Sequence, residues 1–193
     1  MYEVYFQKFN EKVALTQQEE DFIKQYLTPK RLRKKQYLLQ AGDVCRQVGF
    51  VEKGALRAYL ADEKGDEHIT AFAFEGWAIS DLPSFIRQEP ASLNIEALED
   101  CELLLLSKAA HDELLQKLPK YESYLRILVT NAYISIQQRM TDMISLSIED
   151  RYLAFTKMHQ LLFQRVPQHM IASFMGLSPE TLSRVRSRLS NKK

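Results

Sequence analysis

The chain has 193 residues, of which 46% are hydrophobic and 26% charged, and its formal net charge is +1. This length is long for one average domain and short for two, and the composition excludes a mainly disordered, collagen-like or low-complexity protein. The apolar runs are too short for a membrane helix, and the charged start predicts no secretory signal. We therefore expect a cytoplasmic protein without membrane contact.

The sequence predicts no metal, iron–sulfur or disulfide site. Its two cysteines, Cys45 and Cys101, lie far apart and form no C-x-x-C pair, so we expect two reduced, buried thiols. The histidines show neither H-x-x-x-H nor H-x-E spacing, and we interpret them as structural or surface residues. They are His68, His111, His159 and His169.

Charge is distributed unevenly along the chain. Residues 164–193 carry six basic residues and one acid, whereas residues 1–163 carry 20 basic and 24 acidic residues. A basic C-terminal segment on a mildly acidic body indicates contact with a polyanion. A solvated tail without function has the same composition and is the alternative.

The first predicted element is a helix within residues 10–29. Thr16 is a suitable N-cap, and Glu19 stands three residues later, as in a capping box. Pro29 follows the predicted end of the helix. An apolar face is formed by Phe22, Ile23, Tyr26 and Leu27.

Residues 31–107 predict short strands separated by turns. The clearest turns fall at 41–43, 52–54 and 62–66, and no long helix lies between them. Turns at this spacing are typical of an antiparallel sandwich or barrel. About seventy residues of such strands are enough to enclose a small pocket.

The C-terminal part predicts helices at 108–117, about 121–147 and 149–163. Apolar residues of the long helix recur with a mean step of 3.6, which keeps them on one stripe. This stripe lies either against the chain's own sheet or in a dimer seam. We favour the seam, because about 27 helical residues span about 40 Å, a length that a single small β-domain hardly covers. The stripe consists of Leu125, Leu128, Ala132, Ile136, Met140 and Met143.

Residues 168–189, QHMIASFMGLSPETLSRVRSRL, fit a helix-turn-helix. Ala172 stands where the second helix packs closely on the first, and Gly176 stands at the turn, where a positive φ suits glycine. Ser178 is a suitable N-cap and Pro179 a suitable first residue of the second helix. The inward-facing positions hold Ile171, Met175, Leu177, Leu182 and Val185.

The second helix presents a polar face that fits a DNA major groove. Glu180, Arg184 and Arg188 follow one another at steps of four, and arginine pairs with guanine while glutamate accepts from the cytosine amino group. A surface ion pair between Glu180 and Arg184 is the alternative. The predicted DNA-binding residues are Ser178, Glu180, Thr181, Ser183, Arg184, Arg186 and Arg188. For phosphate contacts we expect Arg186, Lys192 and Lys193.

The segment IASFMGLSPETLSRVRSRL resembles the DNA-reading motif of the Crp/Fnr family of bacterial transcription regulators. The likeness covers nearly the whole chain, because Gly42 and Gly54 resemble turn glycines of the family's cyclic-nucleotide-binding β-roll and the long helix resembles its dimerisation helix. It implies an α+β chain with an antiparallel β-roll effector domain, the dimerisation helix and a helix-turn-helix of winged-helix type. The corresponding domains are 1–118, 119–147 and 148–193.

The resemblance also implies partners and base-reading residues. It implies a homodimer on promoter DNA with half-sites about one turn apart, and contact with RNA polymerase. Glu180 and Arg184 match the family's base-reading glutamate and arginine. Pro179 stands where some members have a base-reading arginine, so the operator sequence does not transfer.

The effector site departs from the family pattern. Members that bind cyclic nucleotides hold the ribose with a Gly-Glu pair and the cyclic phosphate with an Arg-Ser or Arg-Thr pair. Here Asp81 and Ser92 remain as candidates at these positions, but the arginine is missing. A buried phosphate without its counter-charge costs about 3–5 kcal/mol. We therefore predict weak or no cyclic AMP binding, with Arg87 as the one nearby arginine, and the effector, if there is one, stays unknown.

Two other classes of protein remain as alternatives. One is a small-molecule or nucleotide-binding module without DNA-binding function. The other is an enzyme, but the sequence contains no G-x-x-x-x-G-K-[ST], G-x-G-x-x-G or G-x-S-x-G motif. The leading hypothesis is therefore a DNA-binding transcription regulator without enzymatic activity, and the sequence does not show whether it activates or represses.

Overall fold

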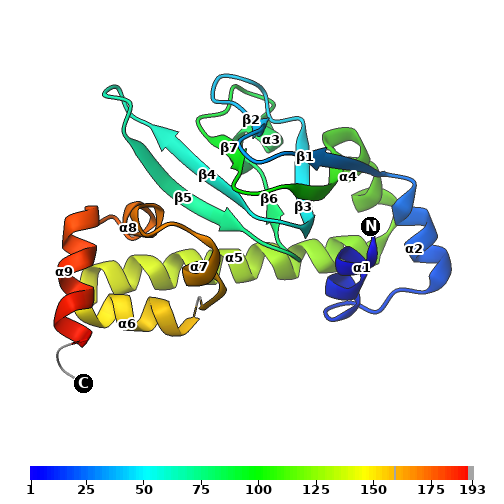
Figure 1. Ribbon diagram of the computed structural model, residues 1–193. Coiled ribbons are helices and arrows are strands. Elements are labelled where there is room, and N and C mark those ends of the chain that lie inside the picture. The colour runs from blue at the N-terminus through cyan, green and yellow to red at the C-terminus, as the bar shows by residue number, and fades with distance from the viewer. Residues whose placement is uncertain (159, 191–193) are drawn as a thin grey trace. The chain divides into compact units, whose positions relative to one another are not determined.

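The computed structural model describes residues 1–158 and 160–190. It divides into two compact units, unit 1 (Met1–Leu128) and unit 2 (Val129–Lys193), and the boundary falls inside the long helix α5 (Pro119–Ser145). Figure 1 shows the elements of both units. The three-part division at residues 118 and 147 stays a prediction.

Unit 1 begins with the helices α1 (Glu3–Asn10) and α2 (Gln17–Lys24). The predicted capping box of α2 is confirmed, because Thr16 accepts a bond from the backbone N–H of Glu19 and the Glu19 carboxylate accepts one from Thr16. The predicted start of this helix at Thr16 is correct, but its predicted C-terminal end is wrong, because α2 ends at Lys24. Residues 11–16 are not helical, and β1 begins at Leu27, because pairing with β8 overrides the local helical pattern.

In the described residues, eight strands form two four-stranded antiparallel sheets, in the orders β1-β8-β3-β6 and β2-β7-β4-β5. The antiparallel prediction is thereby confirmed, whereas β6 and the short helix α3 (Leu82–Arg87) were not predicted. The strands are β1 (Leu27–Leu32), β2 (Tyr37–Leu39), β3 (Gln47–Lys53), β4 (Leu56–Ala61), β5 (Glu67–Ala73), β6 (Ala78–Ile79), β7 (Asn94–Ala97) and β8 (Cys101–Ser107).

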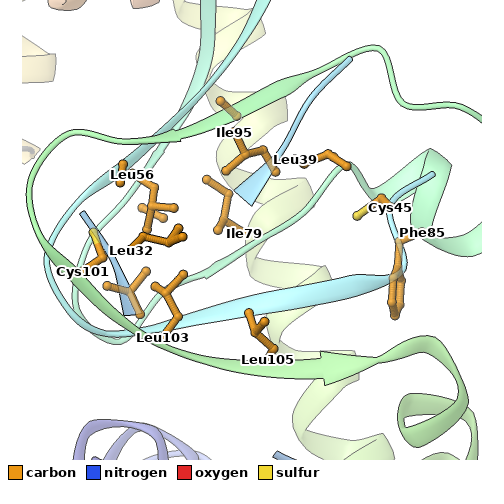
Figure 2. Packing of buried hydrophobic residues seen from close by; sticks show 14 of the residues in the cluster. Leu32, Leu39, Cys45, Leu56, Ile79, Phe85, Ile95, Cys101, Leu103 and Leu105 are labelled. Atoms are coloured by element: carbon orange, nitrogen blue, oxygen red, sulfur yellow. The ribbon is translucent and has the colours of Figure 1, made fainter. Parts of the chain in front are cut away.

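The space between the two sheets is filled by apolar side chains, including Leu56, Ile95 and Leu103 (Figure 2). Both cysteines belong to this core as free, buried thiols, and burial raises the pKa of Cys101 to about 11. Gly54, between β3 and β4, has a φ of +102°, and a Cβ there would lie 2.6 Å from Cys101 Sγ. The turn therefore requires glycine for its backbone conformation and for the close approach of β8.

Helices follow the last strand. Pro119 follows the end of α4 and is the first residue of α5, where proline is well tolerated. The single helix predicted over 149–163 is two helices, α6 (Ile148–Met158) and α7 (Gln160–Arg165). The remaining helices are α4 (Lys108–Lys117), α8 (Gln168–Phe174) and α9 (Pro179–Ser190).

The regular secondary structure in the described residues of unit 2 is helical. Its core contains Ile171, Ala172, Leu182 and Val185, and the aromatic rings of Phe155 and Phe174 lie 5.6 Å apart. In the described part of unit 2 no strand forms, so the wing that a winged-helix type implies is absent there.

Candidate nucleic-acid interface

The helix-turn-helix forms in the predicted register. Gly176 has a φ of +69°, and the backbone N–H of Leu177 bonds the carbonyl of Ala172 at 2.9 Å, which closes the end of α8. The hydroxyl of Ser178 accepts from the backbone N–H of Thr181 at 3.2 Å and caps the start of α9. The sequence therefore sets the turn and the direction of the second helix.

Burial separates the two faces of α9. Leu182 and Val185 are buried, whereas Glu180 and Arg184 are exposed. The pKa of the Glu180 carboxyl is lowered, first by a bond from its own backbone N–H and next by the Ser178 hydroxyl. Arg184 donates to the Thr181 hydroxyl at 3.3 Å. An ionised acceptor and an arginine thus lie on the solvent side of a helix whose other side is anchored.

The remaining predicted residues of α9 fall into two groups. Arg188 is exposed and donates to Glu149 of α6 at 3.2 Å, an exposed pair worth about 0–1 kcal/mol. Ser183 and Arg186 line a groove of about 860 Å³ together with α6 residues such as Tyr152. Arg188 can exchange its partner for DNA at little cost, and Arg186 lies toward α6. The expected phosphate contacts Lys192 and Lys193 lie outside the described residues.

The long helix α5 carries an exposed apolar stripe. Ile136 and Met140 are 62% and 65% exposed, and Tyr133 and Met143 are exposed beside them. Leu125 and Leu128 at the other end of the predicted stripe are half-buried, and Ala132 is exposed. Sequence reasoning missed Val129 and Ile144, which are exposed as well and extend the stripe at the same helical spacing.

The structure brings the effector candidates Asp81 and Ser92 together, but around a carboxylate that is already occupied. Asp81 is 2% exposed and accepts from the backbone N–H groups of Ser84 at 3.1 Å, Ser92 at 3.0 Å and Leu93 at 3.1 Å. Its side chain caps α3 and ties α3 to the segment before β7. The backbone N–H donors at this place therefore already have a charged acceptor, the carboxylate of Asp81.

The effector candidates Asp81, Arg87 and Ser92 do not line the cavity next to β2. Arg87, at the end of α3, and Ser92 are both exposed. A cavity of about 350 Å³ opens near Leu39, Val44 and Ile95, and its lining includes none of Asp81, Arg87 and Ser92. The cavity is lined by Arg46 and Asp43 as well, and weak or no binding of cyclic AMP stays a prediction.

Sequence reasoning missed a buried contact behind α3. His111 on α4 lies edge-on to Phe85 of α3, with ring centres 5.4 Å apart, and its Nδ1 is 2.8 Å from the hydroxyl of Tyr121 on α5. Burial lowers the pKa of His111. The only signal in the sequence was a histidine among apolar helical positions, which is too common to identify such a contact.

Comparison with known proteins finds a matching domain and similar regulatory proteins. Residues 29–118 match the cyclic nucleotide-binding domain. The chain is 28% identical over 189 residues to the fumarate and nitrate reduction regulatory protein of Vibrio cholerae, covering 91% of this chain and 74% of that protein. It is 26% identical over 190 residues to the transcriptional activator protein anr of Pseudomonas aeruginosa, covering 91% and 76%.

Solved structures show the same fold. A transcriptional regulator of the Crp/Fnr family from Eubacterium rectale superposes with a TM-score of 0.70 at 17% identity, covering 97% of this chain and 88% of that one. The β-roll, the long helix and the C-terminal helix-turn-helix define a regulator architecture. The chain is therefore similar to transcription regulators of the Crp/Fnr family over most of its length.

Proposed function

We propose that the chain is a homodimeric, sequence-specific DNA-binding transcription regulator that places α9 of each protomer in the major groove of promoter DNA. The observation that carries the proposal is the split of α9 into a buried face with Leu182 and Val185 and an exposed face with Glu180 and Arg184. Such a helix, fixed from behind and polar in front, is what base reading requires. The relatives' names support a regulator rather than a small-molecule module or an enzyme.

The exposed apolar stripe on α5 supports dimerisation. A continuous row of exposed Val129, Tyr133, Ile136 and Met140 is costly in water, and a second copy of the same helix covers it in the way a coiled-coil seam does. Two protomers then present two α9 helices to two half-sites about one DNA turn apart. The family relationship further supports RNA polymerase as a partner and the cytoplasm as the location. Among the described residues, no helix has the length and apolar character needed to cross a membrane.

The effector domain is proposed to work without cyclic AMP. Asp81 already occupies the backbone donors around it, and no arginine stands beside Ser92. Isothermal calorimetry with cyclic AMP should therefore detect no binding at micromolar concentration. Tight binding would contradict this part of the proposal.

A footprinting screen with promoter DNA tests DNA binding directly. We expect protected segments with two-fold symmetry at physiological salt without added nucleotide. If no fragment is bound above non-specific affinity, with or without a panel of nucleotides, the proposed function is wrong.

Sedimentation tests the dimer. Met140→Asp places a charge in the stripe and should yield monomers that lose most of their affinity for a two-half-site duplex. Asn131→Asp adds the same charge at an exposed position on the opposite side of α5 and should leave the dimer intact. Equal behaviour of the two variants would exclude the stripe as the seam.

A further inference from the structure

Unit 1 carries one strongly basic segment that DNA reading by α9 does not use. Five of the six residues at positions 30–35 are basic, and all five are exposed; they are Lys30, Arg31, Arg33, Lys34 and Lys35, here called the β1–β2 basic patch. The rest of residues 1–128 carries 12 basic and 21 acidic residues. The patch is therefore a concentrated positive region on an otherwise acidic unit.

Most of this charge is not neutralised within the protein. Arg31 contacts Glu102 at 3.2 Å, across the pairing of β1 with β8. The carboxylate of Asp100 accepts from the backbone N–H of Lys34 at 2.9 Å. In the part of the chain that the structure describes, the side chains of Lys30, Arg33, Lys34 and Lys35 form no ion pair. Four charges are thus free to bind an external anion.

The fold holds the patch in a fixed position. The turn after β1 is closed by a bond from the Gln36 backbone N–H to the carbonyl of Arg33 at 3.0 Å and by one from Arg33 N–H to the Gln36 side chain at 2.7 Å. The backbone N–H of Lys35 bonds Ala97 at 2.8 Å, and Leu32 is buried in the core between the sheets. Because the turn is pinned at both ends, its cations project from a rigid base and lose little backbone freedom on binding.

The composition of the patch favours phosphates over a protein partner. Lysine is depleted in protein–protein interfaces, which use buried aromatic and arginine anchors, whereas DNA-binding surfaces are polar and strongly positive. Protection of the exposed edge of β1 needs no more than Pro29 and Lys30. The three further basic residues in the turn are not explained by edge protection.

We propose that the β1–β2 basic patch is a second, sequence-independent DNA contact, which binds phosphates outside the base pairs that α9 reads. This inference rests on the proposed function, because the patch adds a contact to DNA that α9 already binds. The contact adds affinity and salt dependence without sequence information, since phosphates are the same at every base pair.

The experiment compares two duplexes and two matched variants. The short duplex has about 22 base pairs and covers only two half-sites, and the long duplex has about 60 and adds flanking DNA. The patch variant is Lys30→Gln, Arg33→Gln and Lys34→Gln. The control variant, Lys12→Gln, Arg46→Gln and Lys64→Gln, removes the same charge from elsewhere on unit 1. Affinity is measured at several salt concentrations for each pair.

The patch variant should bind the long duplex about 10-fold more weakly and the short one less than about twofold more weakly. Its salt slope on the long duplex should fall by about 0.9 for each phosphate that the patch no longer neutralises. The control variant should change both affinities by less than about twofold.

Equal weakening by the two variants, or wild-type affinity of the patch variant for the long duplex, would overturn the proposal. Unchanged DNA affinity together with weaker binding of an acidic protein partner would assign the patch to that partner and overturn it as well. If the wild type itself binds neither duplex, the proposed function fails instead.

Discussion

Two short segments of the molecule use the same device for opposite purposes. Asp81 and Ser178 are both N-caps, the first of α3 in unit 1 and the second of α9 in unit 2. Asp81 is buried, and its carboxylate also holds Ser92 and Leu93, whereas Ser178 is exposed and holds only the first turn of α9. A buried N-cap such as Asp81 can therefore hold neighbouring segments together, whereas an exposed N-cap such as Ser178 only begins a helix whose polar face is open to solvent.

The largest effect should follow from removing the buried cap. Asp81→Ala leaves three backbone N–H groups without their charged acceptor and should cost more than about 3 kcal/mol of unfolding free energy, since each bond to a charged group contributes about 1.5–3 kcal/mol. Trp77 is the only tryptophan and lies in unit 1, so its fluorescence during urea unfolding reports on this unit. A change below about 1 kcal/mol would show that the Asp81 network does not hold α3 in place.

The exposed cap should matter less. Ser178→Ala removes one bond at a solvated helix start and should lower the stability of unit 2 by about 1 kcal/mol. Circular dichroism follows this loss of helix, while the Trp77 transition should stay unchanged. A loss as large as that of Asp81→Ala would contradict the contrast drawn between the two caps.

The smallest effect concerns pH and the histidine behind α3. Burial lowers the pKa of His111, so the unfolded chain binds a proton below about pH 6.5 that the folded chain resists. The contribution of His111 to stability is therefore present at neutral pH and is lost as pH falls through this value. The melting temperature should drop more between about pH 7.5 and about pH 5.5 for the wild type than for His111→Gln. Equal drops would show that His111 titrates normally.

The fold was predictable where local signals agree with long-range pairing. The strand turns, the capping box at Thr16 and the register around Gly176 all follow from neighbouring residues. Helix α1 was not, because its first N–H groups are capped by Glu52, a residue of β3 far away in the chain, through a bond to Tyr5 at 2.7 Å. Burial raises the pKa of Glu52, and nothing in residues 1–10 indicates this partner.

The candidate site divides in the same way. The exposure of Glu180 and Arg184 follows from helical spacing, which the sequence contains. The occupation of Asp81 does not, because three backbone donors from two separate segments converge on it only in the folded protein. Likewise, the run of basic residues at 30–35 is visible in the sequence, but its lack of ion-pair partners among the described residues is a property of the fold.

The central claim, that the outer face of α9 reads DNA bases, is tested most directly by selecting bound duplexes from a randomised pool with the wild type and with Arg184→Ala. We expect the wild type to select a two-fold symmetric sequence with a guanine preference in each half-site. Arg184→Ala should lose that preference, with about 1–3 kcal/mol less binding free energy, while the other positions keep theirs. An unchanged base preference, or equal weakening on every sequence, would contradict base reading by this helix.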